Sequence, residues 1–408
     1  MACRVGSTFA SLRHRNFRRY LVAQVGSNVG GWIQITAETW LVLELAHSGL
    51  ALGITNALQF GPLVVMGLYG GVIADRFQRR RLLIATQSAL ALLAFAMGLL
   101  VATGLIELWM IWLAALLLGV VMSVDRPALL SFVKDLAGEE ALPNAVALNN
   151  AATSAGRMLG PVAGGTLVAT VGSASCFFIN AASFALVVLV LARLDVRQLQ
   201  SDSPVARKPG QVREVLSLVR RDRILKLTVM AMSVVFVAAY NFQVLVPLLV
   251  SRRFDGSSAL YGAAMSSLGL GAVAGSLLVA SWAKPALGRV AAGGFLLCAS
   301  YAGLALPLVP AVAMGGLFLL GVCCGFFNVT VAGILQLHAG DDSRGRLMSL
   351  YSIGILGSGL LGAPLAGALA DHVGLAPTLL AIAAVCAATA IATACAQALS
   401  RRTGEAGR

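Results

Sequence analysis

The sequence predicts an all-α membrane protein with twelve transmembrane helices in two pseudo-symmetric six-helix bundles. The first observation behind this prediction is composition: 58% of the 408 residues are hydrophobic and only 12% are charged. Soluble domains carry about 25% charged residues, so the composition excludes a soluble enzyme. The second observation is a series of apolar runs, each of which is long enough to cross a bilayer as a helix. The third is a set of motifs that both halves of the chain share.

The predicted spans follow the apolar runs along the chain. They cover residues 20–45, 51–74, 82–104, 108–134, 144–171, 174–193, 224–250, 258–283, 288–309, 311–337, 346–370 and 376–399. The longest polar stretch, Asp195–Arg223, separates the sixth run from the seventh. We therefore expect an N-terminal bundle over residues 1–194, a cytoplasmic linker over 195–223 and a C-terminal bundle over 224–408.

The basic residues predict how the spans are oriented. The net charge is +13, but the 30 Lys and Arg residues lie mostly between apolar runs. Short loops that are rich in Lys and Arg stay in the cytoplasm. With the N-terminus inside, the outer loops hold only Arg252 and Arg253. We therefore expect a multi-pass protein with both termini in the cytoplasm, in the inner (plasma) membrane of a bacterium, and no nucleic-acid partner.

Glycine and proline motifs recur in the two halves. Gly156, Pro161 and Gly164 in the fifth predicted span match Gly359, Pro364 and Gly367 in the eleventh at a single offset. Two parallel six-span repeats are typical of transporters in which two bundles rock about a central site.

The loop after the second span carries a family signature. Its residues include Gly71, Asp75, Arg76, Arg79, Arg80 and Arg81, and it resembles the loop between spans two and three of the major facilitator superfamily. It departs from that signature at Gln78, where a glycine is usual. The fifth span, with Gly156, Gly160, Pro161, Gly164 and Gly165, resembles the antiporter motif of exporter branches.

Other stretches resemble the enterobactin-exporter-like branch of this superfamily. They include Arg15-Asn16-Phe17-Arg18, Asp125-Arg126-Pro127-Ala128 and Leu142-Pro143-Asn144-Ala145. The resemblance covers residues 10–395. It implies the major facilitator fold, a monomer, and efflux of a small molecule such as a drug or siderophore.

The two motifs have a functional and a structural interpretation. Asp75 would lie against the free N–H groups at the N-terminus of the eleventh span, and so stabilise one conformer. The alternative for this cluster is a purely topogenic role. The glycines of the fifth span would allow close helix packing, and Pro161 would bend the helix. The alternative there is generic packing.

Ionisable residues within the spans are candidates for proton coupling. Asp125, Arg126 and Arg157 lie at similar depth in the fourth and fifth spans, where a pair between Asp125 and Arg157 is feasible. Protonation of Asp125 would break such a pair and favour the other conformer. The alternative is a structural buried pair. Glu38 in the first span is a second candidate, which could carry protons, contact a cationic substrate or simply reach the outer water beside Glu44.

A further set of polar side chains could line a substrate cavity or form interhelical hydrogen bonds. The set comprises Gln24, Asn28, Gln34, Asn149, Tyr240, Asn241, Gln243 and Asn328.

These observations predict a secondary transporter that works by alternating access. We expect proton-coupled efflux of a small amphipathic molecule, with no cofactor or metal and no energy source but a gradient. Nucleotide-binding and hydrolase motifs do not occur in the sequence. The main alternative is proton-coupled uptake of a nutrient. A membrane enzyme and a channel are rivals of other classes, but the sequence shows neither a catalytic constellation nor a filter-like loop.

Overall fold

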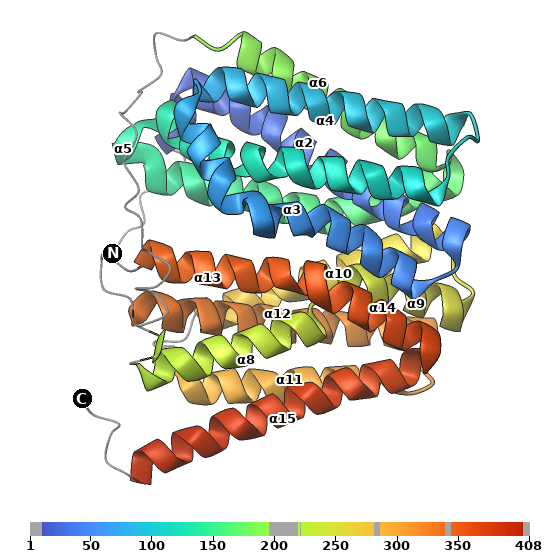
Figure 1. Ribbon diagram of the computed structural model, residues 1–408, viewed down its shortest axis with the longest axis vertical. Helices are drawn as coiled ribbons and strands as arrows, with labels where there is room; N and C mark the ends of the chain where they lie inside the picture. The colour runs from blue at the N-terminus through green and yellow to red at the C-terminus, as the bar shows by residue number, and fades with distance from the viewer. Residues whose placement is uncertain (1–9, 196–218, 221, 281–285, 339–343, 403–408) are drawn as a thin grey trace. The chain divides into compact units, whose positions relative to one another are not determined.

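The computed structural model describes residues 10–195, 219–220, 222–280, 286–338 and 344–402, and every regular element in these ranges is helical (Figure 1). The predicted linker 195–223 therefore lies largely outside the described residues. Two compact units divide the chain, and neither is continuous in sequence. Unit 1 holds residues 1–46, 61–206 and 257–266, and unit 2 holds residues 47–60, 207–256 and 267–408.

Unit 1 is built around α2 (Arg15–Ala46), α4 (Arg79–Ala102), α5 (Leu108–Thr170) and α6 (Ser173–Ala192), with η1 (Ala10–Arg13) before them. The part of α3 (Gly49–Arg76) that begins at Gly61 also belongs to unit 1. The helix α2 packs against α5 and α6, and α4 packs against α6 and α5. A core that includes Phe17, Tyr20, Leu83, Phe132 and Leu191 joins these helices.

The 63 residues of α5 contain two helices that meet at Gly138. The backbone of Gly138 has φ 75° and ψ 169°, a conformation that glycine adopts readily. The loop expected between the fourth and fifth spans is thus reduced to a sharp break. Pro143 lies inside the second of these helices, shortly after the break.

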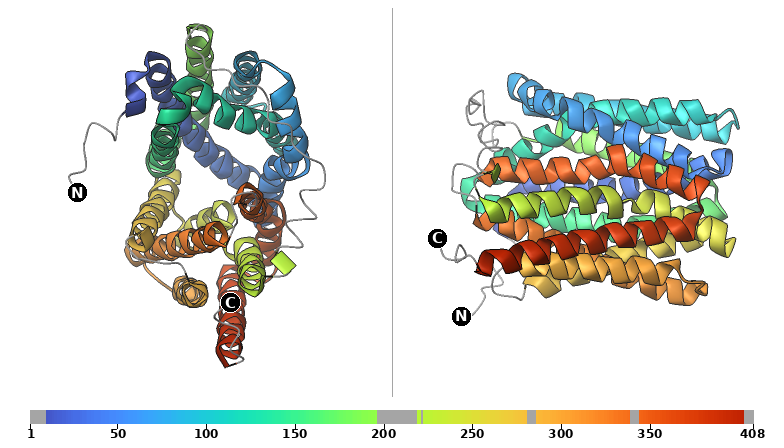
Figure 2. Two further views of the ribbon diagram at one scale, coloured as in Figure 1. Left: turned by 90° about the vertical axis from the view of Figure 1, so that its left-hand side faces the viewer. Right: turned by 60° about the horizontal axis from the view of Figure 1, so that its bottom comes forward.

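Unit 2 contains α8 (Arg223–Ala239), α9 (Phe242–Phe254), α11 (Leu287–Ala305), α12 (Pro310–Leu337), α13 (Arg344–Gly357), α14 (Ala363–His372) and α15 (Leu375–Arg402). A π-helical turn, η3 (Ser358–Gly362), connects α13 to α14. Most of α10 (Ser258–Ala280) also belongs to this unit. Within it, α11 lies beside α15 and α12 (Figures 1 and 2).

The seventh predicted span, 224–250, is interrupted. The helix α8 ends at Ala239, and α9 begins at Phe242. Asn241 occupies the break, and its side-chain amide donates to the carbonyl of Val237 at 2.7 Å. This bond satisfies a carbonyl that the helix end leaves free.

The described part of the chain has ten helical segments that are long and apolar enough to cross a membrane. The predicted first and fifth spans are helical as well, in α2 and in the second half of α5, but they are not among the ten. Polar side chains such as Gln34, Glu38 and Arg157 explain their lower hydropathy. The count of twelve spans therefore stays a prediction.

Candidate functional site

The carboxylate of Asp125 is buried in unit 1 between α5 and α4, with 1% of the residue exposed. Thr86 donates its hydroxyl to Oδ1 at 2.5 Å, and the Gln87 amide lies 3.0 Å from both carboxylate oxygens. Two consecutive residues of α4 thus hold the acid in place. The sequence analysis did not predict Thr86 and Gln87 as partners of Asp125, because it proposed a pair with Arg157. Pairing of Asp125 with Arg157 stays a prediction.

Arg126 and Arg157 are exposed although both lie in predicted spans. The guanidinium carbon of Arg157 lies 5.6 Å from the centroid of the Trp32 ring, in a cation–π arrangement. The positive charges of Arg126 and Arg157 repel each other, whereas Asp125 attracts Arg126. The structure thus gathers three of the predicted ionisable residues, together with Trp32, within unit 1.

Glu38 belongs to a different polar cluster of unit 1. It is 8% exposed and hydrogen bonds to Gln34, one turn earlier on α2. The amide of Asn180 on α6 donates to Gln34 Oε1 at 2.6 Å, and the Ser183 hydroxyl lies 3.0 Å from Asn180 Oδ1. Gln34 therefore acts as an interhelical hydrogen-bonding residue.

The remaining candidates for a cavity lining fall in both units. In unit 1, Gln24, Asn28 and Asn149 are half-buried, and each has one buried side-chain atom without a hydrogen-bond partner among the described residues. In unit 2, the Tyr240 hydroxyl donates to the carbonyl of Cys324 at 2.9 Å, and Tyr351 donates to Asn328. Gln243 is half-buried at the start of α9.

The glycines of the fifth span lie directly against neighbouring backbones. A Cβ at Gly156 would lie 2.9 Å from the carbonyl of Asn28, and one at Gly164 would lie 2.9 Å from that of Ile33. A Cβ at Gly160 would collide with Trp32, and one at Gly165 with the carbonyl of Ser258. These residues therefore bring α5 into close contact with α2 and with the first turns of α10.

The carbonyl of Pro161 belongs to the same contact. It lies where a Cβ of Gly262 would project. Two hydroxyl groups of α10 reinforce the packing: Ser258 donates to the Gly165 carbonyl at 3.2 Å, and Ser266 donates to that of Met158 at 2.8 Å.

The arginines after α3 bind different partners at the start of α4. Arg79 forms a 2.6 Å ion pair with Asp135 of α5. Arg80 donates to the carbonyls of Leu191 and Ala192 at the end of α6, at 2.7 and 2.6 Å. Arg81 is exposed. The surroundings of Gly71 and the side chains of Asp75 and Arg76 lie outside the described part of the chain.

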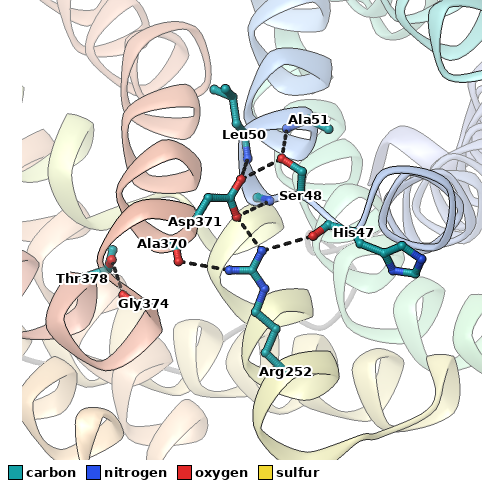
Figure 3. A network of polar contacts seen from close by, with 10 residues as sticks. His47, Ser48, Leu50, Ala51, Arg252, Ala370, Asp371, Gly374 and Thr378 are labelled. Carbon is teal, nitrogen blue, oxygen red and sulfur yellow. Dashed lines mark hydrogen bonds and ion pairs between the residues drawn. The ribbon is translucent and has the colours of Figure 1, made fainter.

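A second acid–arginine network lies at the end of α14 in unit 2 (Figure 3). The Asp371 carboxylate accepts from the backbone N–H groups of Gly49 and Leu50 at 2.8 and 2.9 Å, and from the Ser48 hydroxyl at 2.7 Å. Arg252 of α9 forms a 2.5 Å ion pair with it and also donates to the carbonyl of Ala370 at 3.0 Å. The carboxylate thus caps the positive end of the α3 dipole.

Sequence reasoning missed Asp371, although the chain carries a signal for it. Gly367-Ala-Leu-Ala-Asp371 repeats the pattern of Gly71-Val-Ile-Ala-Asp75. In both segments the acid follows the glycine and lies at the end of a helix. The repeat predicted from the sequence pairs the fifth span with the eleventh, and this register does not align the second span with the eleventh.

A family model described as transmembrane secretion effector matches residues 6–405. The chain belongs to this family. It is a transporter of the major facilitator type and not an enzyme, as the sequence predicts.

Curated relatives of this transmembrane secretion effector include siderophore transporters. It is 24% identical to the staphyloferrin A transporter of Staphylococcus aureus over 254 residues, which cover 62% of this chain and 63% of that protein. It is 26% identical to the enterobactin exporter of Escherichia coli over 371 residues, covering 87% and 85% of the two chains. An uncharacterized MFS-type transporter of Bacillus subtilis is 24% identical over 370 residues, covering 87% and 86%.

Solved transporter structures share the fold of this family member. A bacterial homologue of the human lysosomal transporter Spinster, in an inward-facing and occupied conformation, aligns with a TM-score of 0.73 at 13% identity, covering 94% and 97% of the two chains. The nucleoside transporter NupG aligns with a TM-score of 0.72 at 12% identity, covering 93% and 98% of the two chains. At such identities the likeness shows the fold alone.

Proposed function

We propose that the protein is a proton-coupled exporter of a small amphipathic molecule, such as a drug or siderophore, that works by alternating access. The observation that carries the proposal is the buried carboxylate of Asp125 beside the exposed guanidinium of Arg126. An ionisable group inside a span is costly and is usually kept for transport. In our proposal, Asp125 takes up a proton from one side of the membrane and releases it to the other.

The exporter has twelve spans, both termini in the cytoplasm, and works as a monomer in the inner membrane of a bacterium. It needs no cofactor, because the proton gradient supplies the energy. Two motifs control the exchange between the two conformers: the family signature in the loop after the second span, and the antiporter motif in the fifth span. The family and its siderophore-transporting relatives support this assignment.

Glu38 is a second candidate proton carrier. Its location inside the bundle, with Gln34 as a partner, would allow protonation to be coupled to packing of α2 against α6. Asp125 is the stronger candidate because it interacts with the positive charge of Arg126.

Metabolite profiling of cells and medium tests the proposal. We compare a deletion strain with strains that express the wild type or Asp125→Asn. A compound that accumulates inside the deletion and Asp125→Asn cells, and appears in the medium of the wild type, is the exported substrate. A compound that only the wild type depletes from the medium would establish uptake instead.

A further inference from the structure

We propose that Thr86 is a positioning residue whose hydroxyl group stabilises both protonation states of Asp125 by turning between two acceptors. The inference deepens the proposed function and rests on it, because it takes Asp125 as the proton carrier. Thr86, Gln87 and Asp125 all belong to unit 1, and they are 9%, 2% and 1% exposed. The carboxyl group therefore has to find its hydrogen-bond partners inside the bundle, with and without its proton.

Thr86 has two acceptors for a single hydroxyl hydrogen. Its Oγ1 lies 2.5 Å from Asp125 Oδ1 and 3.2 Å from the carbonyl oxygen of Leu83, one turn earlier on α4. Bonds from threonine to the carbonyl of the preceding turn are common in helices. A hydroxyl group has one hydrogen to donate, so the two contacts are alternatives, and rotation about the C–O bond exchanges them.

The ionised state of Asp125 uses the first of these contacts. Thr86 donates to Oδ1, and Gln87 donates through Nε2, which lies 3.0 Å from each carboxylate oxygen. Hydrogen bonds to a charged acceptor are about twice as strong as those between neutral groups. Both donors therefore favour the carboxylate over the carboxylic acid.

Protonation reverses the direction of the hydrogen bond between the two side chains. A proton that binds Oδ1 forms a covalent O–H bond there, and this group donates to Thr86 Oγ1. The Thr86 hydrogen then turns to the Leu83 carbonyl, and no covalent bond of the threonine breaks. Both hydroxyl hydrogens have acceptors, so the buried acid is not left with an unmade hydrogen bond.

Gln87 differs from Thr86 in this second role. The amide presents Nε2 to the carboxylate, and its buried Oε1 has no hydrogen-bond partner among the described residues. As placed, the amide is a donor alone and stabilises only the ionised state. The two neighbours on α4 thus differ in what they do for the protonated acid, and this difference can be measured.

Other ionisable groups also act on Asp125. The guanidinium group of Arg126 attracts its charge, and the hydroxyl of Tyr20 on α2 interacts with it. On α4 the basic residues Arg79–Arg81 lie more than one turn before Thr86, and the sequence of α6 contains no ionisable residue but Cys176. The variants below keep all of these groups, so that changes in titration report on Thr86 and Gln87.

Infrared difference spectra of the purified full-length protein in liposomes test the proposal. A pH titration reveals the carbonyl band of each protonated carboxyl group, and the band that Asp125→Asn removes belongs to Asp125. Thr86→Val keeps the shape of the side chain without its hydroxyl group. We expect it to raise the pH midpoint of this band by about one unit, because the ionised acid loses a charge-assisted bond and the protonated acid only a neutral one.

The position of the band distinguishes the two neighbours. Thr86→Val should move it to higher wavenumber, because the acid O–H loses its acceptor, and Thr86→Ser should restore both the midpoint and the position of the wild type. The matched control is Gln87→Met, which should raise the midpoint and leave the position unchanged. Thr86→Ala is a second variant without the hydroxyl group, for use if valine prevents folding.

A midpoint and band position like those of the wild type in Thr86→Val or Thr86→Ala would overturn the proposal. Movement of the band in Gln87→Met alone would also overturn it, because the acceptor would then be the amide. In both cases Asp125 still titrates, and the proposed exporter stands. If no band depended on Asp125, the proton carrier of the proposed function would be wrong, and the role of Thr86 would fall with it.

Discussion

The side chain of Asp125 accepts hydrogen bonds from two neutral donors, and this decides what its substitution does. Thr86 and Gln87 approach the carboxylate from one turn of α4, and an amide oxygen could accept from either of them. Removal of the charge should therefore leave the helix pair assembled. The residue can be tested for proton transfer without loss of the fold.

Asp125→Asn should abolish proton-dependent export, because the amide does not titrate. We expect the flux of the compound found by metabolite profiling to fall by about tenfold or more, a barrier increase of at least about 1.4 kcal/mol. The measurement is flux in everted vesicles under an imposed pH gradient. The matched control is Glu38→Gln, which removes another buried acid of unit 1. Retained coupling in Asp125→Asn, together with its loss in Glu38→Gln, would transfer the role to Glu38.

Arg80→Gln should destabilise the protein, because Arg80 satisfies two carbonyls at the end of α6. Loss of charged hydrogen bonds at a partly exposed site should cost about 1–2 kcal/mol. Thermal unfolding in detergent measures the change. Arg81→Gln is the control, since its side chain is exposed one residue further along α4. Equal midpoints for the two variants would contradict the capping role.

At the scale of helices, Asp371 connects three elements of unit 2. Its carboxylate caps α3, pairs with Arg252 of α9 and belongs to the last turn of α14 (Figure 3). Ser48 adds a second cap, because its oxygen accepts from the N–H of Ala51 at 3.3 Å.

Asp371→Asn should weaken this junction. The amide retains one acceptor but loses the ion pair and the charge at the helix N-terminus, at a cost of about 1–2 kcal/mol. Unfolding in detergent should show a lower midpoint, and a second variant, Arg252→Gln, should add little once Asp371 is changed. The control is Asp255→Asn, at an exposed left-handed position that asparagine tolerates. Fully additive effects of the two substitutions would show that they act separately.

Hydropathy predicted the helical class, and the resemblance of the motifs indicated the family, but neither predicted the breaks within helices. The expected loop after the fourth span is a single turn at Gly138, because one glycine with positive φ suffices to reverse the chain. The seventh span breaks at Tyr240 and Asn241 because the Asn241 side chain provides the hydrogen bond that ends α8. Apolar residues continue on both sides of such a break.

Side-chain partners were harder to predict than the candidate residues. The sequence identified Asp125, but its partners on α4 depend on how two helices are rotated about their axes, which hydropathy does not determine. The Gly160 contact with Trp32 likewise requires the register between α5 and α2. The side-chain partners in the candidate site could not be predicted because the sequence does not determine the register between neighbouring helices.

At the scale of the whole molecule, the two units exchange segments of the chain. Residues 47–60 join unit 2, although they precede most of unit 1, and residues 257–266 join unit 1. Each unit therefore needs a segment from the opposite half of the sequence.

This exchange predicts the behaviour of split chains. Fragments 1–206 and 207–408 should each accumulate poorly in membranes when expressed alone, since each lacks a segment that its unit buries. Co-expression should restore both to levels near those of the intact chain, as judged by immunoblot of membrane fractions. If both fragments accumulated normally by themselves, the exchanged segments would be dispensable for folding.

The glycines that face backbone have a consequence for mutational tolerance. Gly271 and Gly275 on α10 lie against carbonyls of α12, and Gly321 and Gly325 on α12 lie against carbonyls of α10. Any change in the first two bases of a glycine codon adds at least a methyl group. Saturation mutagenesis under selection should therefore deplete every allele at these four codons, including alanine, yet spare alanine at Gly303 and Gly315, where no atom lies within 4 Å. We therefore expect these four codons to accept synonymous changes alone.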